Sequence, residues 1–135
     1  MGETVAEIRV IGPKDSKKIH ALVDTGATNT VIDEELADEL GIEATRADEV
    51  MLADGSVDKV GVGRAEIEIE DTKQVVPVYI YKGTLVGLTT LEAAGLRVNP
   101  ISQKLEKVPG KLLGLAVPRT KLFLLTGDPT KCFGV

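Results

Sequence analysis

The chain has few of the side chains that build aromatic cores, disulfides or histidine-based sites. Its 135 residues include no tryptophan, two tyrosines, two phenylalanines, one cysteine and one histidine. The lone cysteine, Cys132, forms no disulfide within the chain, and one cysteine with one histidine cannot build an all-nitrogen-and-sulfur zinc site. We therefore expect an aliphatic core, no metal, no cofactor and a cytoplasmic location, where thiols stay reduced.

Basic clusters and long apolar runs are missing as well. The net charge is −5 and the lysines and arginines are scattered, which is not the footprint of a protein that binds nucleic acid or an anionic membrane. No apolar run approaches the roughly 20 residues of a membrane-spanning helix. Residues 1–11 carry Glu3, Glu7 and Arg9, which is not the pattern of a secretory signal. We expect neither nucleic acid nor a membrane among the partners.

Nucleophilic catalysis finds little support in the sequence. The serines lie in turn-like or linker contexts without the pattern of a nucleophile elbow. His20 stands between Ile19 and Ala21, where a half-buried strand position is a simpler interpretation than a general base. A pair of His20 with Cys132 is the remaining alternative, although a lone cysteine near a C-terminus is more often incidental.

Short strand patterns dominate what the chain does contain. One segment alternates strictly, with Ala65, Ile67 and Ile69 between charged residues, which indicates one buried and one solvated face. The Asp-Gly pair at 54–55 predicts the turn of a hairpin over 49–59. Strands are predicted at 4–11, 17–23, 30–32, 64–70, 75–81 and 85–87. The fold class that follows is all-β, mostly strand with one or two short helices.

The two helices are predicted from the signals at their ends. Asp33 is the expected N-cap of the first helix, which Gly41 ends. Thr89 or Thr90 is the expected cap of the second, which Gly95 ends.

The last part of the chain differs in composition. We assign residues 1–100 to one domain and 101–135 to a C-terminal extension. The stretch around 104–110 has the composition of an exposed connection. The runs 112–117 and 122–125 are too apolar for a solvated tail, so we expect one more hairpin that packs on the domain or on a second subunit.

One short stretch, Asp24-Thr25-Gly26-Ala27, occurs only once and has the features of a catalytic loop. It follows the apolar run 21–23 and so places one carboxylate on a tight, glycine-containing loop at the tip of a buried strand. Loops carried by a rigid sheet often hold catalytic groups, although an ordinary Asx-turn is the structural alternative. Because the chain has no second Asp-Thr/Ser-Gly, chemistry that needs two such carboxylates must take the second from another copy of the chain.

Three segments together resemble the retropepsin-like aspartic peptidases, particularly their compact microbial members. They are residues 22–32 around the Asp-Thr-Gly, the hairpin turn at 51–56, and the strand and helix over 85–95. The segments occur in the expected order, and with the preceding strand they cover about three quarters of the chain.

The resemblance implies a closed retropepsin-like acid protease barrel that forms a two-fold homodimer. Asp24 from each subunit joins the catalytic pair, which activates a water for peptide hydrolysis. Thr25 bonds across the dimer to the partner's loop, Gly26 accepts the substrate backbone, and Ala27 belongs to the same active-site loop. The implied function is an aspartic endopeptidase.

The resemblance also assigns a flap to the hairpin tip, Ala53, Asp54 and Gly55, which closes over an extended peptide or unfolded protein substrate. The match departs from viral members at Thr28 and Leu88, which occupy the positions of their acid–arginine ion pair, and at the flap tip, which lacks their glycine-rich sequence. Two functions stay open: the endopeptidase, and a dimeric module of the same fold that binds peptide or aids assembly with little or no proteolysis.

Overall fold

Strands and two short helices make up the part of the chain that the structure describes, residues 3–108. In this computed structural model the elements are β1 (Thr4–Ile11), β2 (Ser16–Val23), β3 (Thr30–Asp33), α1 (Glu34–Leu40), β4 (Arg46–Met51), β5 (Val57–Ile69), β6 (Thr72–Tyr81), β7 (Leu85–Val86), α2 (Leu88–Ala94), β8 (Leu96–Val98) and β9 (Leu105–Lys107). The predicted class, mostly strand with one or two short helices, is confirmed. The hairpin expected within 112–125 lies outside the described residues.

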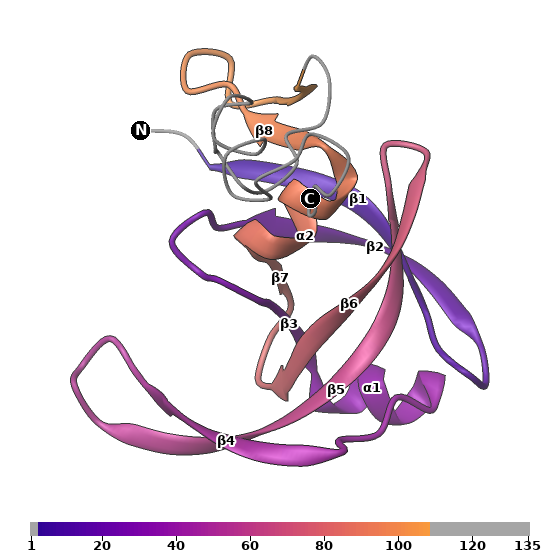
Figure 1. Cartoon of the computed structure of the whole chain (residues 1–135), viewed down its shortest axis with the longest axis vertical. Helices are drawn as coiled ribbons and strands as arrows, with labels where there is room; N and C mark the ends of the chain where they lie inside the picture. The colour runs from indigo at the N-terminus through magenta and orange to yellow at the C-terminus, as the bar shows by residue number, and fades with distance from the viewer. Residues whose placement is uncertain (1–2, 109–135) are drawn as a thin grey trace, which may run out of the picture.

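The larger sheet nearly closes on itself (Figure 1). Its order is β1-β2-β7-β3-β6-β5-β4, and β1 also pairs with β5, so the sheet rolls up and β4 is left outside the ring. Most neighbouring strands are antiparallel, whereas β2 with β7 and β3 with β6 are parallel. This mixed, nearly closed sheet agrees with the barrel that the resemblance implies.

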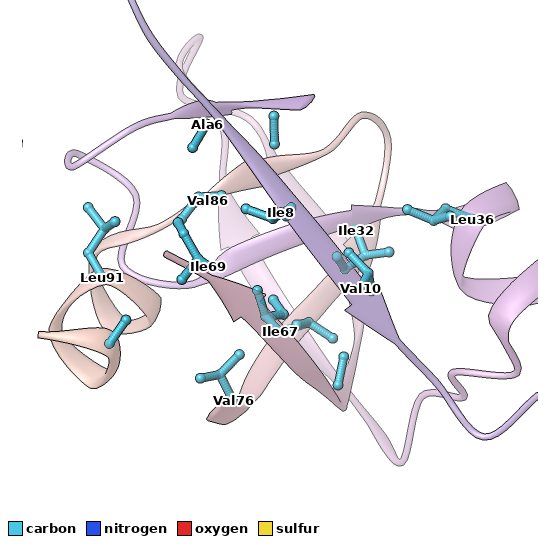
Figure 2. Packing of buried hydrophobic residues seen from close by; sticks show 14 of the residues in the cluster. Ala6, Ile8, Val10, Ile32, Leu36, Ile67, Ile69, Val76, Val86 and Leu91 are labelled. Carbon is cyan, nitrogen blue, oxygen red and sulfur yellow. The ribbon is translucent and has the colours of Figure 1, made fainter. Parts of the chain in front are cut away.

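Aliphatic side chains fill the interior of the rolled sheet (Figure 2). Along β1 the alternate residues Ala6, Ile8 and Val10 are buried, and Ile67 and Ile69 of β5 are buried by the same period-two rule. Full burial of one such isoleucine or valine stabilises a fold by about 1.5–3 kcal/mol. A core with few aromatic residues is therefore sufficient, as the composition predicts.

The first helix begins and ends as its sequence predicts. The Asp33 carboxylate accepts a hydrogen bond from the Glu35 N–H at 3.0 Å, and Gly41 takes the left-handed conformation with φ of 78°. Asp33 also accepts the Gly83 N–H at 2.9 Å and donates its own N–H to Thr84 Oγ1 at 3.1 Å. One residue thus joins α1 to the turn that follows β6.

The second helix and the chain beyond it depart from the predictions. Gly87 is the N-cap of α2, not Thr89 or Thr90, and no side chain caps this end, because Thr90 turns into the core instead. The chain around Leu105 is not an exposed connection but strand β9, which pairs with β8. Leu96 is buried and Leu105 partly buried against the core, which explains why the two strands pack here.

Candidate active site

The loop between β2 and β3 holds Asp24 at the end of a paired strand. β7 runs parallel to β2, so the Asp24 N–H donates to the Val86 carbonyl at 2.9 Å. The loop then turns tightly, with the Ala27 N–H donating to the Asp24 carbonyl at 3.1 Å. The Gly26 N–H donates to Asp24 Oδ1 at 2.9 Å. Backbone bonds therefore fix both the position of this residue and the direction of its carboxylate.

The side chains of this loop are accessible in the single chain. Asp24, Thr25 and Gly26 are exposed, and Ala27 is half-buried. A Cβ added to Gly26 would lie 3.2 Å from Asp24 Oδ1, so a larger residue would crowd the carboxylate. The structure thus brings the four predicted loop residues together and leaves the carboxylate free to meet another group.

Backbone hydrogen bonds tie the loop to α2. The N–H groups of Leu88 and Thr89 donate to the carbonyl oxygens of Ala27 and Thr28 at 2.8 and 2.9 Å. These bonds lie at Thr28 and Leu88, the two positions where the ion pair of viral members is missing. Two backbone bonds therefore hold the start of α2 against the loop, without a side-chain ion pair between these positions.

Two buried threonines, which the sequence patterns do not predict, fix the far end of the loop. Thr30 at the start of β3 and Thr90 in α2 are almost fully buried, with their Oγ1 atoms 2.6 Å apart. Thr30 Oγ1 also accepts the Gly87 N–H at 3.0 Å. The sequence around them gives little signal, since each threonine follows a polar residue and precedes an apolar residue, Val31 or Leu91.

Gly87 allows α2 to approach the loop from behind. A Cβ added to Gly87 would lie 2.4 Å from the carbonyl carbon of Asn29 and 2.9 Å from the Thr30 nitrogen. Both contacts are with backbone, which cannot turn aside as a side chain can. Only glycine therefore fits at this position without moving the loop or the helix.

Two hollows adjoin the loop. The smaller, of about 230 Å³, is lined by Asp24 and Thr25 together with Glu3 and Thr4 at the start of the described chain. The larger, of about 970 Å³, is mostly apolar and is lined by α2, β8 and the β8–β9 connection. Thr25 borders both hollows, so the loop lies at the edge of an apolar depression.

The predicted flap residues form the tip of the β4–β5 hairpin. Ala53, Asp54 and Gly55 are exposed and lie between Leu52 and Ser56, with Gly55 at φ of 89°. Asp54 Oδ1 accepts the Ser56 hydroxyl at 2.6 Å and the Ser56 N–H at 2.9 Å. These two bonds, the hydroxyl first, lower the pKa of Asp54 below its ordinary value. The tip is a well-formed turn.

The predicted loop residues, 24–27, and the predicted flap residues, 53–55, do not contact each other through hydrogen bonds in the structure. In Figure 1 the loop after β2 and the tip of the hairpin project from the same side of the domain. Within residues 3–108, no hydrogen bond connects 24–27 with 53–55. His20 is exposed on β2, so the expected half-burial is wrong: it alternates with the buried Ala21 and faces outward. Cys132 lies outside the described residues.

These features agree with a comparison to known protein families. A family model described as aspartyl protease matches residues 6–99, which is more than half of the chain. The match includes the Asp24 loop, the β4–β5 hairpin and α2. The chain therefore belongs to the retropepsin-like aspartyl protease family.

Two further observations add less. A search of curated proteins found no match to the chain. Neither helix in the described part of the chain has the length and apolar character needed to cross a bilayer.

Proposed function

We propose that the chain is an aspartic endopeptidase whose active site forms when two copies meet about a two-fold axis, each contributing Asp24. The observation that carries the proposal is a single Asp-Thr-Gly loop that is held by backbone hydrogen bonds and exposes its carboxylate. Membership of the aspartyl protease family supports the type of reaction.

The second carboxylate comes from another copy because the described chain offers no equal to Asp24. Hydrolysis by carboxylates alone needs one group as the base and another as the acid. Glu3 lines the hollow beside Asp24, but it is exposed, and among residues 3–108 no hydrogen bond or ion pair holds its side chain. A second Asp24 loop supplies a carboxylate held in the same way, which is the preorganisation that catalysis requires.

The chemistry follows from two carboxylates held a few ångströms apart. Because two negative charges this close repel each other, both carboxylates do not ionise together and the pair retains one proton. The ionised member takes a proton from the water between them, and the protonated member donates to the scissile carbonyl as the tetrahedral intermediate forms. Gly26 lacks a side chain beside Asp24 Oδ1, which leaves room for the substrate backbone.

The larger hollow supports the two-fold assembly. Thr25 lies on its edge, and Leu88, at 38% exposure, contributes to its apolar lining. Exposed apolar surface of this kind is typical of interaction sites. A second copy that reaches the Asp24 loop also covers this surface, so one contact assembles the site and removes apolar area from water.

The substrate is an extended or unfolded polypeptide. The β4–β5 hairpin extends past the ring, and its paired residues Met51 and Val57 are 75% and 58% exposed near the tip. As a flap, this hairpin covers a peptide lying across the two Asp24 loops, excludes water and offers apolar contacts to substrate side chains.

The test is cleavage of an unstructured protein at several pH values between about 4 and 7, from mildly acidic to neutral. Asp24→Asn is expected to abolish cleavage while circular dichroism and sedimentation stay unchanged. Glu3→Gln is the matched control and is expected to retain activity. Equal cleavage by the Asp24→Asn variant contradicts the proposal, and peptide binding without cleavage by the unaltered protein supports the binding module instead.

A further inference from the structure

The β4–β5 hairpin leaves the sheet as a two-stranded arm. β5 pairs with β6 as far as Gly61, whereas from Val60 to Val57 it pairs with β4 alone. Figure 1 shows this arm extending beyond the rolled sheet. A two-stranded hairpin is marginally stable by itself in water. The position of the arm therefore depends on the contacts that tie it to the rest of the domain.

The root of the arm contains two glycines that lie close to the chain leading into β4. A Cβ added to Gly61 would lie 2.8 Å from the Ala44 Cβ, and one added to Gly63 would lie 2.5 Å from the Glu43 carbonyl oxygen. On this face the chain that leads into β4 packs directly against β5, with the Ala44 methyl group over Gly61 and the Glu43 backbone over Gly63. Glycine in a strand also restricts the backbone less than other residues do. The glycine backbone at the root permits more than one angle of the arm, so a side-chain contact farther along the arm can help to set that angle.

One side-chain hydrogen bond joins the arm to the body of the domain. The Tyr81 hydroxyl donates to Asp58 Oδ2 at 2.6 Å, and Asp58 lies in the arm opposite Val50. Within residues 3–108, no other side-chain hydrogen bond or ion pair runs from residues 48–60 to a residue outside the hairpin. Asp58 is therefore the residue through which the arm is tied to the domain.

The Tyr81 side of this bond is held firmly. Tyr81 ends β6, where it pairs with Asp33 of β3, and Asp33 accepts the N–H of Gly83 in the next turn at 2.9 Å. Lys82 Nζ lies 5.6 Å from the centre of the Tyr81 ring, within the range of a cation–π contact. The donor therefore belongs to the rigid body and the acceptor to the arm.

We propose that the Tyr81–Asp58 hydrogen bond is a latch that sets the position of the β4–β5 arm, which makes Tyr81 a positioning residue for substrate capture. The role in capture rests on the proposed function of the arm as a flap. Tyr81 acts through Asp58 and the arm, so it affects how substrate is bound rather than the chemical step. Loss of the latch therefore raises KM and leaves kcat almost unchanged.

Hydrogen–deuterium exchange and peptidase kinetics on the full chain test the latch. Tyr81→Phe removes the hydroxyl and keeps the ring. Tyr79→Phe is the matched control, because Tyr79 lies two residues away on β6 and its hydroxyl has no partner among the described residues. In Tyr81→Phe, amide exchange over 49–59 should rise about two- to five-fold and KM should rise by a similar factor, because solvent weakens an exposed hydrogen bond even when its acceptor is charged. Exchange over 64–69 should stay unchanged.

A double-mutant cycle with Asp58→Ala completes the test. Because both single variants break the same bond, the double variant should exchange no faster over 49–59 than Tyr81→Phe does. If Tyr81→Phe exchanges over 49–59 only as fast as Tyr79→Phe, the latch is overturned. Faster exchange of Tyr81→Phe throughout the domain also overturns it, since that reports general destabilisation. Amide exchange tests the Tyr81–Asp58 latch even if the protein has no peptidase activity. The Asp24→Asn variant tests the proposed peptidase function. A failure of the latch can therefore be told apart from a failure of the proposed function.

Discussion

The hydroxyl oxygens of Thr30 and Thr90 lie 2.6 Å apart in the core, although 60 positions separate the residues in the chain. The pair joins the start of β3 to α2, and Thr30 also accepts the Gly87 N–H. Through these bonds, the strand that follows the Asp24 loop and the helix behind the loop form one unit. The exposed carboxylate is therefore carried by a buried polar cluster.

Thr30→Val should lower the free energy of unfolding by about 1–3 kcal/mol, because it keeps the shape but leaves the Gly87 N–H and the Thr90 hydroxyl buried without a partner. Urea denaturation followed by circular dichroism measures the change. Thr28→Val is the control, since Thr28 is exposed and takes part in the loop through its backbone. Equal stability of the two variants would show that the threonine pair does not hold the loop.

Gly87→Ala should cost about 2–4 kcal/mol, because the added Cβ meets the backbone of Asn29 at 2.4 Å and forces α2 away from the loop. Thr28→Ala is the control, since Thr28 is exposed and reaches α2 through its carbonyl, which alanine retains. Thermal unfolding compares the two variants. A Gly87→Ala protein as stable as the Thr28→Ala protein would mean that the close approach is not required.

Local signals were enough to predict most of the framework. The alternation of Ile67 and Ile69 with charged residues predicts which face of β5 is buried, and Asp33 and Gly41 predict both ends of α1. The Asp24 loop could be predicted because an apolar strand and a glycine turn are adjacent in sequence. Each of these features depends on residues that are neighbours in the chain.

Contacts between distant segments were not predicted. The cap of α2 was assigned to Thr89 or Thr90 because a threonine before an apolar run usually caps a helix, but burial against Thr30 outweighed that preference. Strand β9 was missed because charged residues flank Leu105, and its pairing with β8 depends on the chain turning back. The Tyr81–Asp58 bond likewise joins positions whose contact depends on the completed sheet.

The pKa of Asp58 should lie below its ordinary value of 3.8 because the Tyr81 hydroxyl donates to the carboxylate, with smaller contributions from the Lys59 N–H and the Lys82 charge. A lowered pKa in the folded state stabilises the protein above the ordinary value, and this contribution is lost as the pH falls through the lowered pKa. A titration of the carboxylate carbons by NMR measures the shift. Tyr81→Phe should raise this pKa towards 3.8, and Tyr79→Phe should leave it low.

An unshifted Asp58 in the unaltered protein would show that the Tyr81 hydrogen bond does not form in solution. The same hydrogen bond should raise the pKa of Tyr81, since it favours the protonated phenol. Ultraviolet absorbance at alkaline pH follows that second titration independently.

Mixing the unaltered protein with an excess of the Asp24→Asn variant most directly tests whether the two carboxylates come from different chains. If each site needs Asp24 from both chains, random pairing at a ten-fold excess should reduce the activity per unaltered chain about ten-fold, provided that subunits exchange. Sedimentation of a mixture with one variant labelled checks that subunits exchange between dimers. Activity that stays constant in a mixture shown to form mixed dimers would contradict a shared site and place both catalytic groups within one chain.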